Sequence, residues 1–247
     1  MGRRSIRKRE GVLAGKLALI TGANRGIGLA LARALAHEGC DLVVTARDRA
    51  TLSKASRELR NRGVSVADQV GDVRDPDSVD YLFALVRGLR RPLDFLINNA
   101  GVGHVSRKVT DLPYPTWSAV IDTNLNGLFL VTQAALAVMK RGSVIVNNLS
   151  IAAERVFPGS SAYNASKHGA LGFTDTLREE LRPSGIRVLA LMPGATDTAI
   201  WNTMWPKAPR RKMMSAETVG KAVVSALILP ENSSVEKLVI MPSGGAL

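Results

Sequence analysis

Residues 17–28 read LALITGANRGIG, an apolar run that leads through a glycine-rich turn into a helical pattern. After this stretch, short β-branched runs alternate with longer helical patterns, which is typical of β-α-β units and of a parallel sheet covered on both faces. We expect seven strands, at residues 17–21, 42–45, 65–70, 93–97, 143–147, 187–191 and 237–240. Helical patterns begin near residues 26, 49, 77, 116, 162 and 216. The sequence therefore predicts an α/β fold, a doubly wound domain with a single seven-stranded parallel sheet and helices on both faces.

The length and composition fit one large domain. With 247 residues, of which 46% are hydrophobic, the chain can bury a sizeable core. We expect the domain to span residues 13–247, preceded by a basic, disordered extension at residues 1–12. Residues 195–215 are the only long irregular segment of the pattern, and we predict that they form a lid or binding loop.

The apolar runs and the cysteine content indicate where the chain resides. No apolar run reaches the roughly 18 residues that a membrane span needs, and the first residues lack the apolar stretch of a secretory signal. The single cysteine, Cys40, excludes an internal disulfide and offers no pair for zinc. We therefore expect no membrane span and a reducing, cytoplasmic location, with Cys40 as a small buried side chain at a strand start.

The chain is basic, with a formal net charge of +12. Residues 1–10 hold five basic side chains and one acidic one, so part of this excess belongs to the extension. A basic chain raises the question of nucleic-acid binding. Because regularly spaced aromatic residues and any recognised zinc or recognition-helix motif are missing, nucleic acid is not expected as a partner.

The turn at residues 21–28 joins the first strand to the first helix. Exposed amide groups and the positive end of the helix favour a pyrophosphate at such a place. The spacing of Gly22, Gly26 and Gly28 differs from the commonest dinucleotide fingerprint, G-x-G-x-x-G. Tight turns need glycine whatever they bind, so the position after the first strand is what favours a nucleotide.

Arg47 follows the second strand, where an acidic residue would bind the ribose hydroxyls of NAD. A guanidinium would instead attract the additional phosphate of NADP, and Arg25 could approach the same phosphate from the glycine turn. Asp48 precedes a helix and is expected to cap it. The alternative for Arg47 is a solvated surface arginine. NADP, or NADPH, is the preferred cofactor on these residues.

Tyr163 and Lys167 are four residues apart in a stretch that reads as the start of a helix, so both side chains project from one face. A nearby ammonium can lower the pKa of a tyrosine from about 10 by roughly 1 to 3 units, into the range of a general acid or base. Taken alone, such a pair is usually a solvated helix face.

Several further motifs change that interpretation. They are the turn at residues 21–28, Asp72, the sequence NNAG at residues 98–101, Asn124, Ser150, Tyr163, Lys167, and Pro193 and Gly194 followed by Thr198. In this order and spacing they make the chain similar to the short-chain dehydrogenase/reductase family, from about residue 13 to residue 243. The resemblance implies a Rossmann-type fold and an NADP-dependent carbonyl reductase, which acts on a ketone or an aldehyde.

The resemblance also implies a role for each residue. Tyr163 would protonate the carbonyl oxygen, Ser150 would hold that oxygen by a hydrogen bond, and Lys167 would lower the tyrosine pKa and bind ribose hydroxyls. Asn124 would position a water that resupplies protons. Cofactor contacts are implied for Gly22, Asn24, Arg25, Gly26, Ile27, Gly28, Arg47, Asp72, Val73, Asn99, Ala100, Gly101, Tyr163, Lys167, Pro193, Gly194 and Thr198. No metal is required, because the cofactor supplies the hydride.

Each of these residues also has a structural interpretation. Ser150 and Asp72 could cap a helix or form a turn, and Asn124 could bond a neighbouring carbonyl. A cofactor-sensing regulator without catalysis is the alternative function, which the complete set of Ser150, Tyr163 and Lys167 disfavours. The resemblance further implies a homotetramer or homodimer through residues 116–139, residues 162–181 and the last strand.

The predicted lid indicates the kind of substrate. Its apolar side chains would exclude water from the reaction: Trp201, Met204, Trp205, Met213 and Met214. Its basic side chains, Lys207 and residues 210–212, could receive an acidic carrier or a phosphorylated group, or keep the loop soluble. A small carbonyl or alcohol compound is expected as substrate, with a 3-ketoacyl thioester as one candidate. His104 is expected to be a loop histidine.

Overall fold

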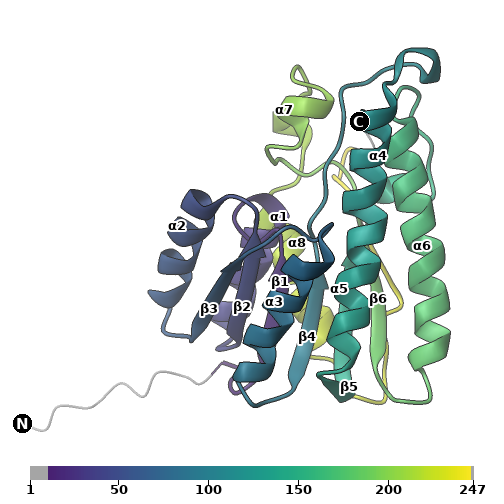
Figure 1. The fold of residues 1–247 in the computed structure, drawn as a ribbon. Coiled ribbons are helices and arrows are strands. Elements are labelled where there is room, and N and C mark those ends of the chain that lie inside the picture. Colours follow the sequence, from purple (N-terminus) through teal and green to yellow (C-terminus); the bar gives the residue numbers. More distant parts are fainter. Residues whose placement is uncertain (1–10, 246–247) are drawn as a thin grey trace, which may run out of the picture.

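The computed structural model, which describes residues 11–245, contains one parallel sheet with the strand order β3-β2-β1-β4-β5-β6-β7 (Figure 1). The strands are β1 (Leu17–Thr21), β2 (Asp41–Ala46), β3 (Val66–Val70), β4 (Leu93–Asn98), β5 (Met139–Asn148), β6 (Arg187–Pro193) and β7 (Lys237–Ile240). All neighbouring strands pair in parallel. The strand order reverses between β1 and β4, the point where ligands bind in doubly wound sheets. The predicted fold is confirmed.

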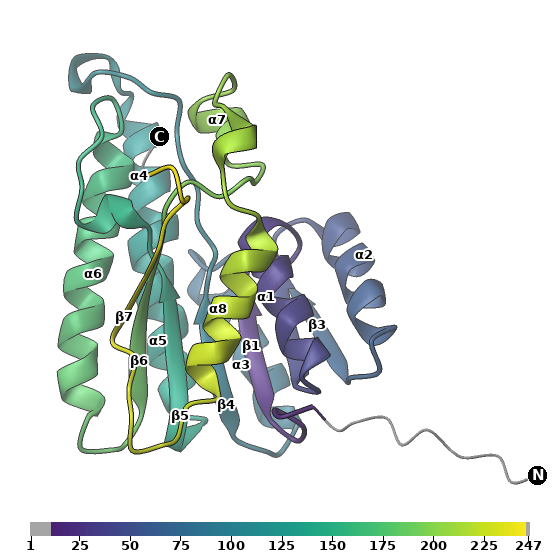
Figure 2. The same cartoon turned by 180° about the vertical axis from the view of Figure 1, so that it is seen from behind.

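Helices cover both faces of this sheet. They are α1 (Gly26–His37), α2 (Arg49–Arg60), α3 (Pro76–Gly88), α4 (Tyr114–Ile121), α5 (Gly127–Leu136), α6 (Ser161–Leu181), α7 (Trp201–Met204) and α8 (Ala216–Leu227), with short 3-10 turns at η1 (Val109–Asp111), η3 (Ile151–Ala153) and η4 (Arg210–Lys212). Figure 1 shows α3, α5 and α6 in front of the sheet, and Figure 2 shows α1 and α8 on the opposite face.

The apolar strand sequences account for this layered arrangement. All five residues of β1 and all six of β4 are buried, as expected for strands that face helices on both sides. On one face Leu31 of α1 and Val223 of α8 pack with Ile20. On the other face Phe83 of α3 packs with Leu19. These two cores fix the carboxyl ends of the central strands, from which the loops of the candidate site emerge.

The segment predicted as one helix from near residue 116 differs from the expectation. It consists of α4, a π-helical turn η2 (Asp122–Asn126) and then α5. The prediction of a single long irregular segment is also wrong, because residues 99–108 lack regular structure as well. Residues 195–215 in turn contain α7 and η4. Both differences are found above the carboxyl ends of the strands.

The described chain starts close to the body of the domain. A Cβ atom on Gly11 would lie 2.1 Å from the backbone of Glu38, so Gly11 packs directly against the end of α1. Residues 1–10 of the predicted extension are outside the described range. Cys40 is fully buried, and burial raises the pKa of its thiol to about 12, in agreement with a structural role. Among the described helices, none has the length and apolar character needed to cross a membrane.

Candidate active site

The glycine turn forms a narrow cradle between β1 and α1. Gly22 and Gly26 have φ values of 64° and 56°, in the left-handed region that favours glycine. A Cβ atom on Gly28 would lie 2.3 Å from the carbonyl oxygen of Gly22, so no larger residue fits there. The side chain of Arg25 makes no capping hydrogen bond to α1. Amide groups of the first helical turn are therefore available to an anion, which fits the phosphates of a dinucleotide.

The NNAG sequence supports this turn from the neighbouring strand. The Thr21 hydroxyl accepts hydrogen bonds from the backbone amides of Asn99 and Ala100, both at 3.0 Å. Asn99 Nδ2 donates to the carbonyl oxygens of Thr21 and Gly22, at 3.0 and 3.2 Å. A Cβ atom on Gly101 would lie 3.8 Å from Lys167 Nζ. The NNAG sequence thus connects the glycine turn to the lysine of the candidate catalytic set.

Arg47 lies just after β2, as predicted, beside other charged groups. Its side chain is 53% exposed, and its Nη1 lies 4.0 Å from Asp72 Oδ2. Hydrogen bonds from Arg74 hold Asp72 and lower the pKa of its carboxyl group, with a smaller contribution from the Arg47 charge. Arg25 is exposed, and its charge contributes to lowering the pKa of Asp48, after the hydrogen bonds from Thr51. Two cationic groups therefore lie close to the end of β2.

Asp48 has the capping role that the sequence predicts. Its carboxylate accepts a hydrogen bond from the backbone amide of Thr51 at 2.8 Å, which caps α2. Asn24 Nδ2 donates to the Thr51 hydroxyl at 2.9 Å. The glycine turn is thereby attached to the first turn of α2, and Arg47 is held beside this junction.

Tyr163 and Lys167 lie one turn apart near the start of α6. Lys167 Nζ is 5.7 Å from the centre of the Tyr163 ring, so the two side chains share one face of the helix. Lys167 is only 5% exposed, and its Nζ donates to the carbonyl oxygen of Asn148 at 3.0 Å. Ser150 follows β5; its hydroxyl accepts a hydrogen bond from the Ala152 amide at 3.1 Å, and it lies close enough to Tyr163 to lower the pKa of the phenol. The structure therefore brings the three predicted residues together.

The pKa values of this pair differ from the expectation. Burial raises the pKa of Tyr163, and the nearby Ser150 side chain only partly opposes this effect. Burial lowers the pKa of Lys167 to about 8. The expected lowering of the tyrosine pKa by the lysine is wrong for the protein alone, because desolvation is the largest effect and only Ser150 opposes it. At neutral pH Tyr163 thus carries the proton that a general acid must supply.

Asn124 lies in the π-helical turn η2 and bridges two parts of the site. Its Oδ1 accepts from the Val102 amide at 2.8 Å, and its Nδ2 donates to the Val102 carbonyl at 2.9 Å and to the Ser166 hydroxyl at 3.0 Å. A cavity of about 10 Å³ is lined by Asn124, Asn148 and Lys167, among others. This volume holds about one water molecule. Asn148 Oδ1 is buried and has no partner in the described chain, so a water would satisfy it.

The predicted lid contacts both the glycine turn and the irregular segment at residues 99–108. Thr198 Cγ2 would lie 3.3 Å from a Cβ atom on Gly26, and Met204 packs against Gly103. Gly194, at the end of β6, donates its amide to the Ile240 carbonyl at 2.8 Å. The lid residues Trp201 and Trp205 pack edge to face, with ring centres 6.4 Å apart.

Arg210 has a role that the sequence analysis missed. It donates to the Thr198 carbonyl and to Asn202 Oδ1, both at 2.7 Å, and it pairs with Asp197. It therefore holds the lid together instead of serving a solvated basic cluster. Its position in a run of basic residues gave no signal of this role.

Four other residues, Ile27, Val73, His104 and Asn148, remain to be compared with the sequence predictions. Ile27 packs against the core of its face, and Val73 contacts Gly127. His104 lies in a loop, as expected, but is only 4% exposed, and its Nδ1 donates to the Val105 carbonyl at 2.8 Å. Asn148 was missed, although polar residues that end the apolar run of β5 are a readable signal. Within residues 11–245 no cluster of His, Cys, Asp and Glu side chains could hold a metal ion.

Comparisons with known proteins agree with this geometry. The sequence pattern named short chain dehydrogenase matches residues 16–209. The chain is 32% identical over 251 residues to dehydrogenase/reductase SDR family member 4 of Bos taurus, covering 97% of this chain and 90% of that protein. It is similar to an alcohol dehydrogenase from Thermococcus sibiricus complexed with 5-hydroxy-NADP, with a TM-score of 0.86, 31% identity and coverage of 92% and 97%. A 3-ketoacyl-(acyl-carrier-protein) reductase from Brucella melitensis, complexed with NADH, has a TM-score of 0.84, 26% identity and coverage of 94% and 98%.

Proposed function

The chain belongs to the short-chain dehydrogenase family of oxidoreductases, and on this premise we propose that it reduces a ketone or an aldehyde with NADPH, using Tyr163 as the proton donor. The observation that carries the proposal is the side-chain arrangement at the start of α6. Tyr163 lies beside the buried ammonium of Lys167, and the Ser150 side chain is close enough to lower the pKa of the phenol. This is the arrangement that protonation of a carbonyl oxygen requires.

The chemistry follows from these groups. With the dinucleotide held at the glycine turn and beside Lys167, the hydride for the carbonyl carbon would come from NADPH. Ser150 donates a hydrogen bond to the carbonyl oxygen, and Tyr163 transfers its phenolic proton to that oxygen, which completes the alcohol. The phenolate that remains is stabilised by the nearby Lys167 charge. A water in the small cavity beside Asn124 and Lys167 is the proposed route by which Tyr163 regains its proton.

The glycine turn and the end of β2 support the cofactor assignment. The first turn of α1 would receive the pyrophosphate, with Gly22, Gly26 and Gly28 allowing close approach. Arg47 and Arg25 would pair with the additional phosphate of NADP. Several similar structures hold NADP, NADPH or an NADP derivative and one holds NADH, so the comparisons favour NADP and this chain's two arginines agree with them. Thr198 and Gly194 are proposed to contact the nicotinamide end.

The lid supports an apolar or mixed substrate. Trp205 and Val105 are large apolar side chains that are about half exposed above the carboxyl ends of the strands. Contact with an apolar ligand would remove these exposed side chains from water, which is favourable. A 3-ketoacyl thioester fits this description, and the similar reductase from Brucella melitensis is named for that substrate class.

The experiment that tests the proposal is a screen of NADPH oxidation with the purified chain across ketones, aldehydes and 3-ketoacyl thioesters, with NADH in parallel. We expect turnover of at least one class, faster with NADPH than with NADH. A chain that binds NADPH tightly but oxidises it with none of these compounds would instead favour the cofactor-sensing alternative.

We further propose that the protein is a homotetramer or homodimer in the cytoplasm. The helices α5 and α6 carry the exposed Phe129 in edge-to-face contact with Phe173, and β7 is the last strand of the sheet. The presence of a single, unpaired cysteine, Cys40, agrees with the proposed reducing location. Localisation of a tagged chain in cell fractions would test this part of the proposal.

A further inference from the structure

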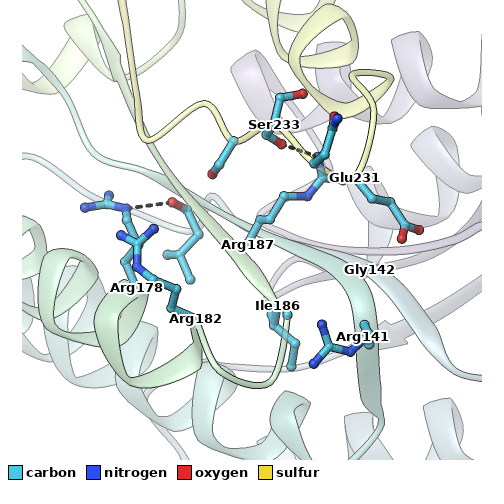
Figure 3. Close-up of a pocket in the computed structure, with 12 residues that line it drawn as sticks. Arg141, Gly142, Arg178, Arg182, Ile186, Arg187, Glu231 and Ser233 are labelled. Carbon is cyan, nitrogen blue, oxygen red and sulfur yellow. Dashed lines mark hydrogen bonds between the residues drawn. The ribbon is translucent and has the colours of Figure 1, made fainter.

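A second polar cavity, drawn in Figure 3, lies at the amino ends of β5 and β6. Ser150 of the candidate site instead follows the carboxyl end of β5. Its volume is about 300 Å³, far above the share of a single water and at the lower limit of small-molecule sites. Four arginines line it: Arg141 of β5, Arg178 of α6, Arg182 directly after α6, and Arg187 of β6. The proposed reductase function makes no use of this cavity.

Two of the four arginines have their charge compensated by carboxylates. Arg178 Nη1 lies 2.7 Å from Asp175 Oδ1. Arg182 Nη2 lies 2.7 Å from Glu179 Oε1 and 3.2 Å from Glu236 Oε1. These two guanidinium groups shape the wall of the cavity, but they offer little unpaired charge to a ligand.

The other two arginines bond only to backbone carbonyl groups in the described chain. Arg141 Nη2 donates to the Pro183 carbonyl at 3.0 Å, and Arg187 Nη1 donates to the Ser233 carbonyl at 3.0 Å. Arg187 Nε is buried and has no hydrogen-bond partner within residues 11–245. Because a guanidinium carries five N–H donors, both side chains retain donors and an uncompensated positive charge.

Glu231 is the one carboxylate among the residues that line the cavity. A Cβ atom on Gly142 would lie 2.8 Å from Glu231 Oε1, so this carboxylate lies against the β5 backbone. Among residues 11–245, Glu231 forms no ion pair with Arg141 or with Arg187. Figure 3 shows its carboxylate on the same side of the cavity as Arg141. Glu231 therefore lowers the positive potential of the cavity without cancelling it.

From this arrangement we propose that the cavity binds a small phosphate monoester, held by Arg141 and Arg187. A phosphate monoester carries a charge of about −1.5 to −2 at neutral pH, which matches two uncompensated guanidinium groups. Arginine forks bind phosphate oxygens in a bidentate manner through their free N–H groups. The volume leaves room for the organic part of the ligand, beside the apolar side chains of Ile186 and Val188.

The test titrates the full chain, without cofactor, with glycerol phosphate and follows heat of binding and the thermal midpoint. Inorganic phosphate, and glycerol at the same concentration, are the comparison probes at constant ionic strength. We expect glycerol phosphate to raise the midpoint and to bind several-fold more tightly than inorganic phosphate, with glycerol inactive. Equal affinities for the two phosphates would overturn the organic part of the proposal.

Substitutions assign the response to this cavity. Arg141→Gln and Arg187→Gln should each weaken glycerol phosphate binding about tenfold or more, because each removes a charged hydrogen bond. Arg47→Gln, at the proposed cofactor site, is the matched control and should leave this affinity unchanged. A response that disappears in Arg47→Gln and persists in Arg141→Gln would place the anion at the cofactor site and contradict the proposal.

Glu231→Gln should change the affinity in the direction opposite to the arginine substitutions, and this test does not depend on losing a structural contact. Removal of this negative charge should strengthen glycerol phosphate binding several-fold. Arg141 is exposed, so its substitution leaves the fold intact even if Arg187→Gln destabilises the loop that it bonds. Unchanged affinity in both Arg141→Gln and Glu231→Gln would overturn the proposal, whatever Arg187→Gln does.

Discussion

Burial controls the titration of the two side chains at the start of α6. Lys167 is almost fully enclosed, and removing an ammonium from water costs more than its hydrogen bond to Asn148 returns. Its pKa falls to about 8, while that of Tyr163 rises for the same reason. The pair therefore holds a protonated phenol beside a lysine that is still mostly charged at neutral pH. This is the protonation state that carbonyl reduction needs.

The buried lysine should make stability depend on alkaline pH. The folded pKa of about 8 lies below the ordinary value of 10.5, so between these values the unfolded chain binds more protons. Stability from this group is lowest below pH 8 and rises with pH up to 10.5, by about 3 kcal/mol in total. Urea unfolding of the wild type and of Lys167→Met between pH 8 and 10.5 measures this change in the free energy of unfolding. The free energy of unfolding of the wild type minus that of Lys167→Met should increase with pH over this range. A value that does not change with pH would contradict the burial of the Lys167 charge.

Arg47 should decide between the two dinucleotides. In Arg47→Asp, an attractive charge at the proposed phosphate position becomes repulsive, so we expect the ratio of kcat/KM for NADPH to that for NADH to fall roughly 10- to 100-fold. Arg57→Asp, on the exposed side of α2, makes the same change of charge and should leave the ratio unaltered. An unchanged preference in Arg47→Asp would show that other residues select the cofactor.

At the scale of elements, the strand-to-helix turn illustrates how much the sequence determines. The glycines of residues 21–28 predict a tight turn, and the structure has Gly28 pressed against the Gly22 carbonyl oxygen. The burial pattern of β1 and β4 likewise follows from continuous apolar runs. Such features are local, because a few neighbouring residues determine them.

Other elements could not be predicted because tertiary contacts determine them. The π-helical turn η2 depends on Asn124, whose partner Val102 lies 22 residues earlier in the irregular segment. The lid is held by Arg210 through Thr198 and Asn202. These hydrogen bonds leave no local pattern in the sequence. The sequence therefore predicted a helix from near residue 116 without a π-helical turn, and an irregular loop at residues 195–215. The identities of Ser150, Tyr163 and Lys167 were accessible from spacing and resemblance, whereas their pKa directions required burial.

Substitution of Gly28 tests the tight turn. In Gly28→Ala the new methyl group would lie 2.4 Å from Asn99 Nδ2, so the turn must shift. We expect a loss of about 1 to 3 kcal/mol in unfolding free energy and weakened NADPH binding. Gly172→Ala, in α6, meets no atom within 4 Å and should instead stabilise by about 0.5 to 1 kcal/mol. Denaturant unfolding and NADPH titration of both variants provide the measurement, and equal effects would contradict the close packing.

At the scale of the whole molecule, the sheet separates two kinds of surface. The loops after β1, β4, β5 and β6 carry the proposed catalytic and cofactor residues, while the arginine-lined cavity lies at the opposite ends of β5 and β6. The helical face formed by α5 and α6 exposes Phe129, 45% of whose surface remains accessible. Phe129 is the apolar side chain that the proposed assembly would cover on this face.

Association of the chain through this face is expected. Light scattering on the eluting peak of a sizing column should give the mass of a dimer or a tetramer, and Phe129→Asp should shift the mass downward by burying a charge at the contact. A wild-type chain with the mass of a monomer at micromolar concentration would contradict the proposed assembly.

The central claim is that Tyr163 gives its proton to a carbonyl oxygen beside the bound cofactor. Its most direct test compares the wild type with Tyr163→Phe in two measurements on the same preparation, NADPH affinity and turnover of the best carbonyl compound. Loss of the phenol should lower kcat by roughly 10² to 10⁴-fold and leave NADPH affinity within a few-fold, because the ring still fills its place. Turnover in Tyr163→Phe at the wild-type rate would contradict the account.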